Sequence, residues 1–593
     1  MRTMLICLSL VVVMLGCSKN DTTSSGSDAL ELLAGFDLQN DGAAICAPEC
    51  LGKECGGDGC GGVCGKCPTA TPFCQDGQCA IDCTTNCEGR LCGPDGCGGS
   101  CGGCADADSC ISGQCQSISP CEAKRGNNSG CEFFAVDLDS AEEGWYDAQH
   151  AQFAVVASNI DVDSSADVTV TSPDGKTLSA TLLPLTLHKF ELPATWSLQD
   201  TSLGKNAFKI SASRPIVAYQ FNPLSNKVEV FSGDASLLLP SPALGAEYYV
   251  VTYKQYETTF RGYFTVVGVS PEPTEVTFTP TCNTLAGGGI PEVKQGQSYT
   301  VTIEHGDVLN IESNESNGDL TGTHITANAP IAVFAGHEAT NTLDECCGDH
   351  IEQQMLPVET WGSHYLVTKT WQRWKEEDHV RIVAAYDGTE VILTPSIAEV
   401  PTLNAGDFYH FQTSVDIEIS ATKPIQVAQY LASAYEILGG SCPAPFTYDS
   451  WHAQCIGPDC SNASQCPTGT ACETYNEQSL CAPIGDTAMI LAVAPDQFMD
   501  TYVFLTPAAY LQDYVNVIAP LNTGMIVLDD EQLDLAALVP VGMSGFGVVR
   551  LQVPDGVHRL WSDKPVGIIV YGYDNDVGYG YPGGMRLSTT GYR

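Results

Sequence analysis

The residues of this chain with the greatest capacity for chemistry are its cysteines, 29 among 593 residues. Sixteen of them form two consecutive groups of eight, at 46–79 and 83–115, with spacings of 4, 5, 5, 4, 3, 7, 5 and then 4, 5, 5, 4, 3, 6, 5. Each group has few large apolar residues, so disulfide bonds rather than a hydrophobic core must hold it together. A CxxC pair in each group leaves metal binding open as the alternative. So many thiols indicate an oxidising compartment, however, and there we expect disulfides.

A further cysteine cluster is the run CCGDH at 346–350, with a His-Glu pair upstream at 337–338. These residue types could bind zinc, although structural zinc sites prefer separated ligand pairs. We expect a disulfide instead, either between Cys346 and Cys347 or from one of them to Cys282. The 27 cysteines that follow Cys17 are an odd number, so one of these three is expected to remain a thiol.

The remaining cysteines predict disulfides at the start of the main body and in one insertion. Cys121 and Cys131 stand ten residues apart and are expected to pair. The insertion 442–481 is expected to form a three-disulfide loop from six cysteines: Cys442, Cys455, Cys460, Cys466, Cys472 and Cys481. Long loops often contain the residues that bind a partner, so Phe446, Tyr448 and Trp451 are predicted to form a contact surface. A stabilised loop without a ligand is the alternative.

No motif in the chain predicts catalysis or a cofactor. The G-x-S-x-G match at 98–102 lies inside a cysteine group, whereas a nucleophile elbow needs a preceding strand and a following helix. Asp161, Asp163 and Asp167, and the run DND at 574–576, could offer oxygen ligands to calcium, but they match no EF-hand loop. Turn formation by Asp and Asn is the favoured interpretation. We therefore expect no metal, no cofactor and no enzymatic activity.

The formal charge of −45, from 71 acidic and 26 basic residues, narrows the class of partner. Such a surface repels phosphate backbones and anionic lipid, which argues against nucleic acid and against electrostatic membrane binding. It suits an extracellular protein.

The N-terminus predicts a lipid anchor. An apolar run at 4–15, too short to span a bilayer, leads into Met-Leu-Gly-Cys and resembles the lipobox of bacterial lipoproteins, in which Cys17 would be acylated. Ser18 after it favours the outer membrane, and an ordinary secretory signal is the alternative. The predicted organisation is a signal peptide (1–16), a flexible tether (17–45), cysteine-rich modules (46–79 and 80–120) and a body (121–593).

One sequence pattern, which we call the proline phrase, occurs four times in the body. Each copy consists of a polar stretch, a proline and an apolar run, and the prolines are Pro215, Pro330, Pro424 and Pro565. Recurring phrases at long intervals indicate a duplicated supersecondary unit, here of about 100 residues. The runs between them are short, rich in β-branched and aromatic residues and separated by Gly, Pro and Asp, which predicts strands. The sequence Asp-Gly-Thr at 387–389 predicts a hairpin turn.

The predicted fold class is all-β, with a four-fold pseudo-repeat closed into a β-propeller-like toroid; tandem β-sandwiches are the alternative. The shortest joint in the repeat, between Pro240 and Tyr249 and its equivalents, predicts a hairpin within one sheet. In the closed ring, the first strand of the body would complete the last sheet and protect its edge.

Several ordered phrases together resemble the IgGFc-binding protein N-terminal domain family. They are GCEFFAVDLD, VAYQFNPLS, SGDASLLLP, FAGHEATN, CCGDHIEQQMLPVETWG and YVFLTP. That domain occurs in a mucus-associated animal protein and in many bacterial surface lipoproteins. The resemblance covers residues 121 to 593, except for the insertion 442–481. It implies a secreted binding domain without catalysis, and it does not imply that this chain binds immunoglobulin.

The predicted function is a lipid-anchored cell-surface binding or adhesion protein. Its partner would be an extracellular glycoprotein, polysaccharide or cell surface, recognised by loops on the β scaffold. The alternatives are a structural component of the envelope and, less favoured, a carbohydrate-active enzyme that uses paired carboxylates.

Overall fold

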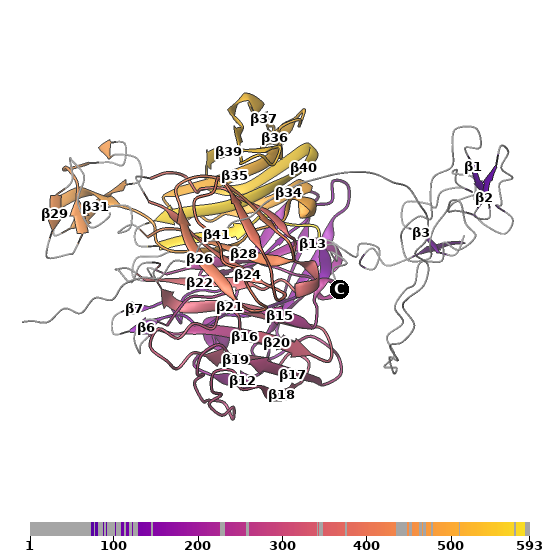
Figure 1. Ribbon diagram of the computed structural model, residues 1–593, viewed down its shortest axis with the longest axis horizontal. Helices are drawn as coiled ribbons and strands as arrows, with labels where there is room; N and C mark the ends of the chain where they lie inside the picture. The colour runs from indigo at the N-terminus through magenta and orange to yellow at the C-terminus, as the bar shows by residue number, and fades with distance from the viewer. Residues whose placement is uncertain are drawn as a thin grey trace, which may run out of the picture. The chain divides into compact units, whose positions relative to one another are not determined.

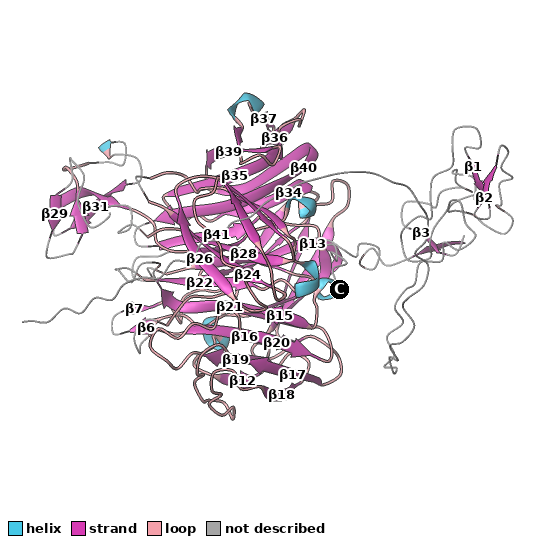
Figure 2. Ribbon diagram, in the orientation of Figure 1, coloured by secondary structure: helices cyan, strands magenta, loops and turns pink. Residues whose placement is uncertain are grey.

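The computed structural model describes residues 128–587 except 144–145, 226–229, 231, 256–259, 341, 343–347, 374–375, 434–446, 450–453, 462–464, 467–469, 476–477, 509 and 575–576. It also describes 73–75, 78–80, 87, 91, 101, 108–111, 114–117 and 121. Nearly all regular structure in these residues is β-strand, with short 3₁₀ turns between strands (Figures 1 and 2). The all-β prediction is confirmed. No helix in this part of the chain is long and apolar enough to cross a bilayer. The predicted signal peptide and tether lie outside the described residues.

The chain separates into two contact units, 1–103 with 110–114, and 104–109 with 115–593. In the first, β1 (Phe73–Gln75) and β2 (Gln78–Ala80) form a hairpin that places Cys74 opposite Cys79. A disulfide joins Cys87 to Cys101. The short pair β3 (Asp108–Ile111) and β4 (Gln114–Ser117) follows. The second predicted cysteine-rich module thus contains at least one disulfide bond.

Each proline phrase is the central strand of two sheets, which together we call a sheet pair. In sheet pair 1, β13 carries Pro215; its first part pairs with β5 and β9, and its second part pairs with β8 and β14. We call the sheet with the second part the inner sheet and the other the outer sheet. The strands are β5 (Gly130–Ala135), β8 (Ala154–Ser158), β9 (Ala166–Thr171), β10 (Thr177–Leu182), β11 (Leu187–Glu191), β13 (Phe208–Asn222) and β14 (Asp234–Leu238).

Sheet pair 2 repeats this order, with β20 before Pro330 pairing with β15 and β17, and β21 after it pairing with β16 and β22. An early strand, β12, joins its inner sheet at β19. The strands are β12 (Ser202–Gly204), β15 (Glu247–Tyr249), β16 (Gly262–Gly268), β17 (Thr274–Thr279), β18 (Tyr299–Ile303), β19 (Val308–Glu312), β20 (His324–Ala327), β21 (Ile331–Thr340) and β22 (Asp349–Gln354).

Sheet pairs 3 and 4 follow the same scheme. The Pro424 phrase, β27 and β28, pairs with β23 and β25 and then with β24 and β33. The Pro565 phrase, β40, pairs with β34 and β36 and then with β35 and β41. The strands are β23 (His364–Val367), β24 (Asp378–Ala384), β25 (Val391–Thr394), β26 (Phe408–Thr413), β27 (Ile417–Ala421), β28 (Ile425–Tyr430), β33 (Met489–Leu491), β34 (Met499–Thr506), β35 (Gln512–Pro520), β36 (Ile526–Leu528), β37 (Glu531–Gln532), β38 (Val539–Pro540), β39 (Phe546–Val553), β40 (Gly556–Asp574) and β41 (Val577–Pro582).

The proline of each phrase marks the point where the chain passes from the outer to the inner sheet. Proline has no N–H to give to a sheet ladder, so the ladder is interrupted there. In sheet pairs 2 to 4 a buried tyrosine hydroxyl replaces the missing bond. The hydroxyl donates to the carbonyl of the residue after the proline: Tyr248 to Ile331 (2.8 Å), Tyr365 to Ile425 (2.8 Å) and Tyr502 to Val566 (2.5 Å). It also accepts the backbone N–H of the residue three positions before the tyrosine: Gly245 (2.9 Å), Gly362 (2.9 Å) and Met499 (3.0 Å). In sheet pair 1 the residue equivalent to these tyrosines is Phe133, which has no hydroxyl. There Gly130 pairs with Ile216 in the strand register.

Two turn predictions are wrong. The turn at 387–389 does not close a hairpin, because β24 pairs in the inner sheet and β25 in the outer sheet. The shortest joint is not a hairpin within one sheet either, since β14 pairs with β13 while β15 pairs with β20. A 3₁₀ turn that begins beside a proline carries the chain between the sheet pairs instead: η2 (Ser241–Ala243), η3 (Val358–Thr360) and η6 (Pro495–Gln497). Fixed proline φ angles suit such abrupt changes of direction.

The last strands of the inner sheets meet one another. β14 contacts β22 and β41, and β33 contacts the same two strands, which gives a closed cycle of four neighbours. One apolar core runs through all four sheet pairs and includes Ile216, Ile331, Tyr430 and Val566. These observations favour a closed arrangement over separate sandwiches; the four-fold repeat and the toroid remain our interpretation of them.

The predicted closure by the first strand is wrong, because β5 pairs with β13 of its own sheet pair. The ends of the body meet through Asn128 instead. Its N–H donates to the Met585 carbonyl (2.9 Å), and its side-chain oxygen accepts the Met585 N–H (3.1 Å). Two reciprocal hydrogen bonds at a buried site thus join segments 457 residues apart.

The remaining elements lie on connections. They are the pair β6 (Glu142–Glu143) and β7 (Tyr146–Asp147), the turns η1 (Ala194–Trp196) and η7 (Leu535–Ala537), and two hairpins of the insertion, β29 (Thr447–Asp449) with β30 (Gln454–Ile456) and β31 (Thr470–Tyr475) with β32 (Gln478–Pro483).

Candidate functional site

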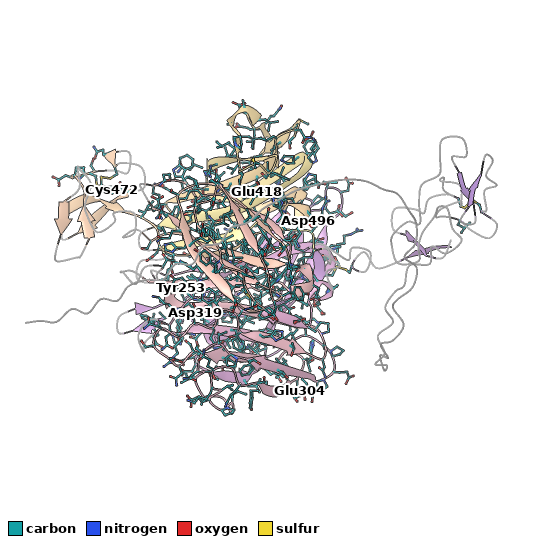
Figure 3. The ribbon with its side chains drawn as sticks, in the orientation of Figure 1. Tyr253, Glu304, Asp319, Glu418, Cys472 and Asp496 are labelled. Carbon is teal, nitrogen blue, oxygen red and sulfur yellow. A yellow bond between two sulfur atoms is a disulfide. The ribbon has the colours of Figure 1, made fainter. Side chains whose placement is uncertain are left out.

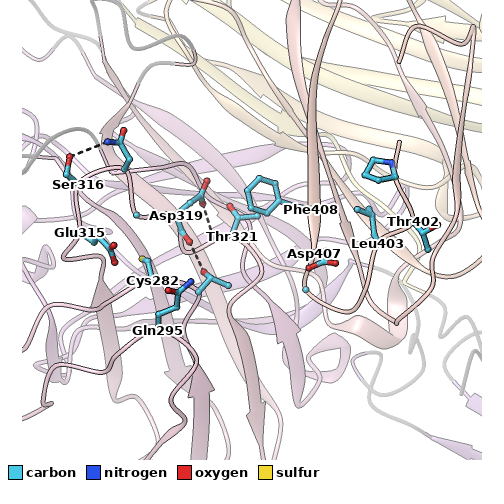
Figure 4. Close-up of a pocket in the computed structure, with 15 residues that line it drawn as sticks. Cys282, Gln295, Glu315, Ser316, Asp319, Thr321, Thr402, Leu403, Asp407 and Phe408 are labelled. Carbon is cyan, nitrogen blue, oxygen red and sulfur yellow. Dashed lines mark hydrogen bonds between the residues drawn. The ribbon is translucent and has the colours of Figure 1, made fainter. Parts of the chain in front are cut away.

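A polar pocket of about 610 Å³ opens between sheet pairs 2 and 3 (Figure 4). One side comes from the loop between β19 and β20, together with Cys282 and Gln295. The other side comes from residues 401–408, which lead into β26. Its size lies in the range of small-molecule and glycan-sized binding sites, about 300–1,000 Å³. We call this cavity the 2–3 pocket.

A buried ion pair holds the two sides of the 2–3 pocket together. Arg381 of β24 donates through Nη1 to Asp319 Oδ2 (2.8 Å) and to Thr321 Oγ1 (2.8 Å). Its guanidinium carbon lies 4.8 Å from the centre of the Phe408 ring and 4.3 Å from that of Tyr253. Arg381 therefore fixes the carboxylate of one side and the aromatic ring of the other. Figure 3 shows Asp319 and Tyr253 in the body of the molecule.

Glycine makes the close approach of the two sides possible. A Cβ on Gly322 would lie 2.1 Å from the Gly406 carbonyl oxygen, which no real side chain tolerates. Both glycines also have positive φ, +87° and +79°, where other residues are strained. The backbone of Thr281 and Asp319 is tied locally, since Thr281 Oγ1 donates to the Asp319 carbonyl (2.7 Å).

The outer rim of the 2–3 pocket offers acceptors and one exposed aromatic ring. Glu315 and Asp407 are exposed carboxylates, and Phe408 is 36% exposed. Hydroxyls and amides from Ser316, Gln295 and other lining residues add both donors and acceptors. Carboxylates bind hydroxyl donors through strong charge-assisted hydrogen bonds, and an aromatic face packs against C–H groups. The rim therefore suits a ligand rich in hydroxyl groups.

Cys282 lines this pocket as a buried free thiol. Burial, with smaller contributions from Asp319 and Glu315, raises the pKa of the Cys282 thiol to about 12. A thiol protonated at neutral pH is a weak nucleophile. Of the three cysteines among which one thiol was expected, Cys282 is the one that the structure describes.

The structure places several of the sequence-predicted residues. Cys121 is disulfide-bonded to Cys131 at the start of the body. In the insertion, Cys460 is bonded to Cys472 and Cys466 to Cys481, and Figure 3 marks Cys472 there. Tyr448 and Cys455 lie in β29 and β30. Outside the described residues are Cys17, Cys346, Cys347, Cys442, Phe446 and Trp451. The contact surface proposed for the insertion therefore stays a prediction.

Of the aspartates weighed as calcium ligands, Asp161 and Asp163 lie in a turn, as expected, whereas Asp167 lies in β9 and Asp574 ends β40. Asp161 Oδ1 accepts the N–H groups of Asp163 (2.9 Å) and Ser164 (3.0 Å). This is the local hydrogen bonding expected of an Asp that forms a turn.

Sequence reasoning did not find the 2–3 pocket. Its two sides are separated in sequence by residues 322–400, which include strands β20 to β25, and none of its residues forms a motif. One usable signal was present: the SNESNGD run at 313–319 and the NAGDF run at 404–408 are both polar loops with a glycine, the composition of binding loops.

Comparison with known proteins gives three findings. The family model described as IgGFc binding protein matches residues 234–572. A human protein described as IgGFc-binding protein is 29% identical over 199 residues, which is 33% of this chain and 4% of that protein. The crystal structure of a tetra-tandem repeat in the extending region of a large adhesion protein aligns with 77% of this chain and 99% of its own, at 10% identity and a TM-score of 0.08. This chain thus spans a small part of the human relative's length, and the TM-score is too low to relate the two folds.

Proposed function

The chain belongs to the IgGFc-binding protein family, and from that premise we propose that it is an extracellular binding protein without catalytic activity. Its partner carries a hydroxyl-rich surface, as a glycoprotein or polysaccharide does. The 2–3 pocket takes part in this recognition, and the loops of the disulfide-bonded insertion extend the contact surface.

The observation that carries the proposal is the combination of an aromatic ring and exposed carboxylates around one pocket. Phe408 is held in place by Arg381, so little side-chain entropy remains to be lost when a ligand packs on it. Asp407 and Glu315 face solvent on the two sides of the pocket. A rigid ring flanked by acceptors can fix the orientation of a sugar or a glycosylated loop.

The geometry gives less support to catalysis. The half-buried carboxylate of the pocket, Asp319, is neutralised by Arg381, and the Cys282 thiol is protonated at neutral pH. The two exposed carboxylates, Asp407 and Glu315, lie open to water rather than in an enclosed site. Recognition by contact, without bond chemistry, is the simpler use of this site.

For the location of the protein, we propose a lipid anchor at Cys17 in a bacterial outer membrane, with the cysteine-rich modules between the anchor and the body. The lipobox-like run before Cys17 supports it. Metabolic labelling with palmitate should mark the full chain and leave a Cys17→Ser variant unlabelled. Persistent label on the variant would contradict the anchor.

Glycan and glycoprotein arrays, including IgG Fc among the printed proteins, provide the test of function. The purified chain should bind a defined set of spots in a saturable manner. Phe408→Ala and Asp407→Asn should weaken that binding by about tenfold each, a loss of ~1.4 kcal/mol, which is typical for a contact at a binding site. Trp561→Ala is the matched control, because Trp561 is an exposed aromatic residue (45%) of another sheet pair.

The outcomes separate the candidate functions. Binding that survives both pocket variants would place recognition elsewhere, for instance at the insertion. The absence of binding on every array would favour a structural role in the envelope. Release of product from a polysaccharide panel would overturn the non-catalytic proposal.

A further inference from the structure

Three carboxylates from distant parts of the chain meet inside sheet pairs 1 and 2. Asp139 follows β5, Glu312 ends β19 and Glu338 lies in β21. One carboxylate oxygen of each lies within 4.8 Å of the others. β19, β16 and β21 are neighbours in one sheet (Figure 1), so the last two of these carboxylates come from a single rigid scaffold.

The backbone around the cluster is tightly held. The Glu312 N–H donates to Thr201 Oγ1 (3.1 Å), and the Glu338 N–H donates to the Arg261 carbonyl (3.0 Å). Glu338 also lies where the β21–β22 register shifts, between His337 and Thr340. Such bulges re-aim side chains and are frequent beside functional sites. The three carboxylates are therefore brought together by the fold.

Three buried oxygens of the cluster have no hydrogen-bond partner. Glu312 is fully buried and Asp139 is 3% exposed. Neither carboxylate oxygen of Glu312 has a hydrogen-bond partner, and Asp139 Oδ2 has none. A buried acceptor without a partner is costly, and natural proteins satisfy such groups with protein, water or an ion. These orphaned oxygens are an observation separate from the clustering itself, and they point at a missing ligand.

The charges of the cluster also leave room for a cation. Arg261 is the one cation in contact among the described residues, with its Nε 3.6 Å from Glu312 Oε2, and its Nη1 donates to the Ser313 carbonyl (2.7 Å). Three ionised carboxylates and one guanidinium carry a net charge of about −2, which a divalent cation would neutralise. Without a cation, burial raises the pKa of all three carboxyls, and burial together with Glu312 raises the pKa of Glu338 to about 9.

We propose that Asp139, Glu312 and Glu338 bind one Ca²⁺ ion. The ligand set is oxygen only, which suits a hard cation and disfavours zinc or copper. Two oxygens bound to the same Ca²⁺ at 2.3–2.6 Å can lie at most about 5 Å apart, in agreement with the 4.8 Å limit of the cluster. Glu338 is half-buried and gives the ion and its remaining water ligands a route from solvent.

Bound Ca²⁺ would tie the segment after β5 to the inner sheet of sheet pair 2. This role is structural and shares no residue with the 2–3 pocket. The cation site and the proposed recognition can therefore each fail without the other.

The test uses the purified full chain after exhaustive treatment with EDTA. At about 10 mM Ca²⁺, roughly tenfold above the weakest extracellular affinities, we expect one Ca²⁺ per chain by isothermal titration and elemental analysis, and a rise in Tm of about 2–4 °C. Glu312→Gln should abolish both effects. In EDTA the same variant should have a Tm at or above that of the wild type, because it removes a buried like-charge repulsion. With Ca²⁺ added, the wild type should instead have the higher Tm of the two proteins.

Glu304→Gln is the matched control, since Glu304 is an exposed carboxylate of the β18–β19 turn in the same sheet pair. It should keep the full response to Ca²⁺. If Glu312→Gln does not fold, Glu338→Gln, at the half-buried member, takes its place with the same expectation. An unchanged wild-type Tm with no bound ion, or equal stoichiometry in wild type and Glu312→Gln, would overturn the proposal.

Discussion

The Asp234 carboxylate and the Gln353 side-chain amide lie among the last strands of the four inner sheets, where the carboxylate accepts backbone N–H groups and the amide faces backbone carbonyls. Asp234 accepts one N–H from each strand: Ala235 (2.8 Å), Glu352 (3.1 Å), Met489 (3.0 Å) and Gly580 (3.0 Å). The Gln353 amide lies within hydrogen-bond distance of the carbonyls on the other three strands: Ala235 (2.7 Å), Met489 (2.6 Å) and Gly580 (3.1 Å). Each of these strands has a ladder partner on one side only, so two side chains satisfy backbone groups on the open side.

Asp234→Asn should be strongly destabilising. The new NH₂ group would face two of the four N–H donors, and buried donors without acceptors cost about 1–3 kcal/mol each. We expect a loss of about 2–4 kcal/mol in the free energy of unfolding, measured by urea denaturation. Asp530→Asn, the same change at an exposed turn residue, should be nearly neutral. A change below about 0.5 kcal/mol at Asp234 would show that the junction does not depend on the carboxylate.

Tyr365→Phe should weaken the crossing between sheets at Pro424. The hydroxyl bridges the Gly362 N–H and the Ile425 carbonyl, and its loss leaves both groups buried without that partner. The expected cost is about 1–3 kcal/mol. Phe133, which already lacks a hydroxyl at the equivalent position, shows that the fold itself does not require one. Tyr409→Phe, at a half-buried strand residue, serves as the comparison, and equal effects of the two changes would contradict the bridging role.

Arg381→Met should reduce both stability and ligand binding. The substitution leaves Asp319 as a half-buried carboxylate without its cation and frees the Phe408 ring. Removing one partner of a buried ion pair costs about 3–5 kcal/mol. Calorimetry would measure the first effect and the array assay the second. Arg214→Met, which removes a charge in sheet pair 1, should affect neither; equivalence of the two variants would remove Arg381 from its assigned role.

The stability of the calcium-free protein should fall as pH rises from about 5 to 9. The pKa of Glu338 is raised to about 9 by burial and by Glu312, so the folded state keeps a proton that the unfolded state releases above its own pKa near 4.5. Asp513, whose pKa burial raises to about 8, acts in the same direction. Tm measured across this range should therefore slope downward, less steeply in Glu338→Gln. Saturating Ca²⁺ should flatten the wild-type profile, and a wild-type profile that rises with pH in EDTA would contradict the protonated cluster.

Loss of the Cys121–Cys131 disulfide should lower stability moderately. The bond closes a loop of ten residues in sequence separation, and the loop-entropy relation gives about 2–3 kcal/mol for such a length. The double variant Cys121→Ser/Cys131→Ser and the reduced wild type should show the same decrease in the urea midpoint. A decrease in the reduced protein alone would assign the effect to other disulfides.

Local composition predicted the strands of the body well. Val, Ile, Tyr and Thr runs such as TEVTFT became β17 because alternating side chains fill one face of a sheet. The spacing of Cys121 and Cys131 likewise allowed a local disulfide to be expected. The turn at Gly388 was misjudged because a turn sequence specifies a change of direction and does not say which sheet receives the next strand.

The sequence by itself determined the strand content, the four proline phrases and the family, since these depend on local pattern and on ordered motifs. Only the tertiary structure decided what those phrases do, namely that each proline carries a strand from an outer to an inner sheet, in sheet pairs 2 to 4 beside a tyrosine hydroxyl. The tertiary structure alone also brought Arg381 to Asp319 and placed Asp139, Glu312 and Glu338 in one cluster. Contacts between residues far apart in the chain depend on how whole sheets pack, and no short-range pattern encodes that packing.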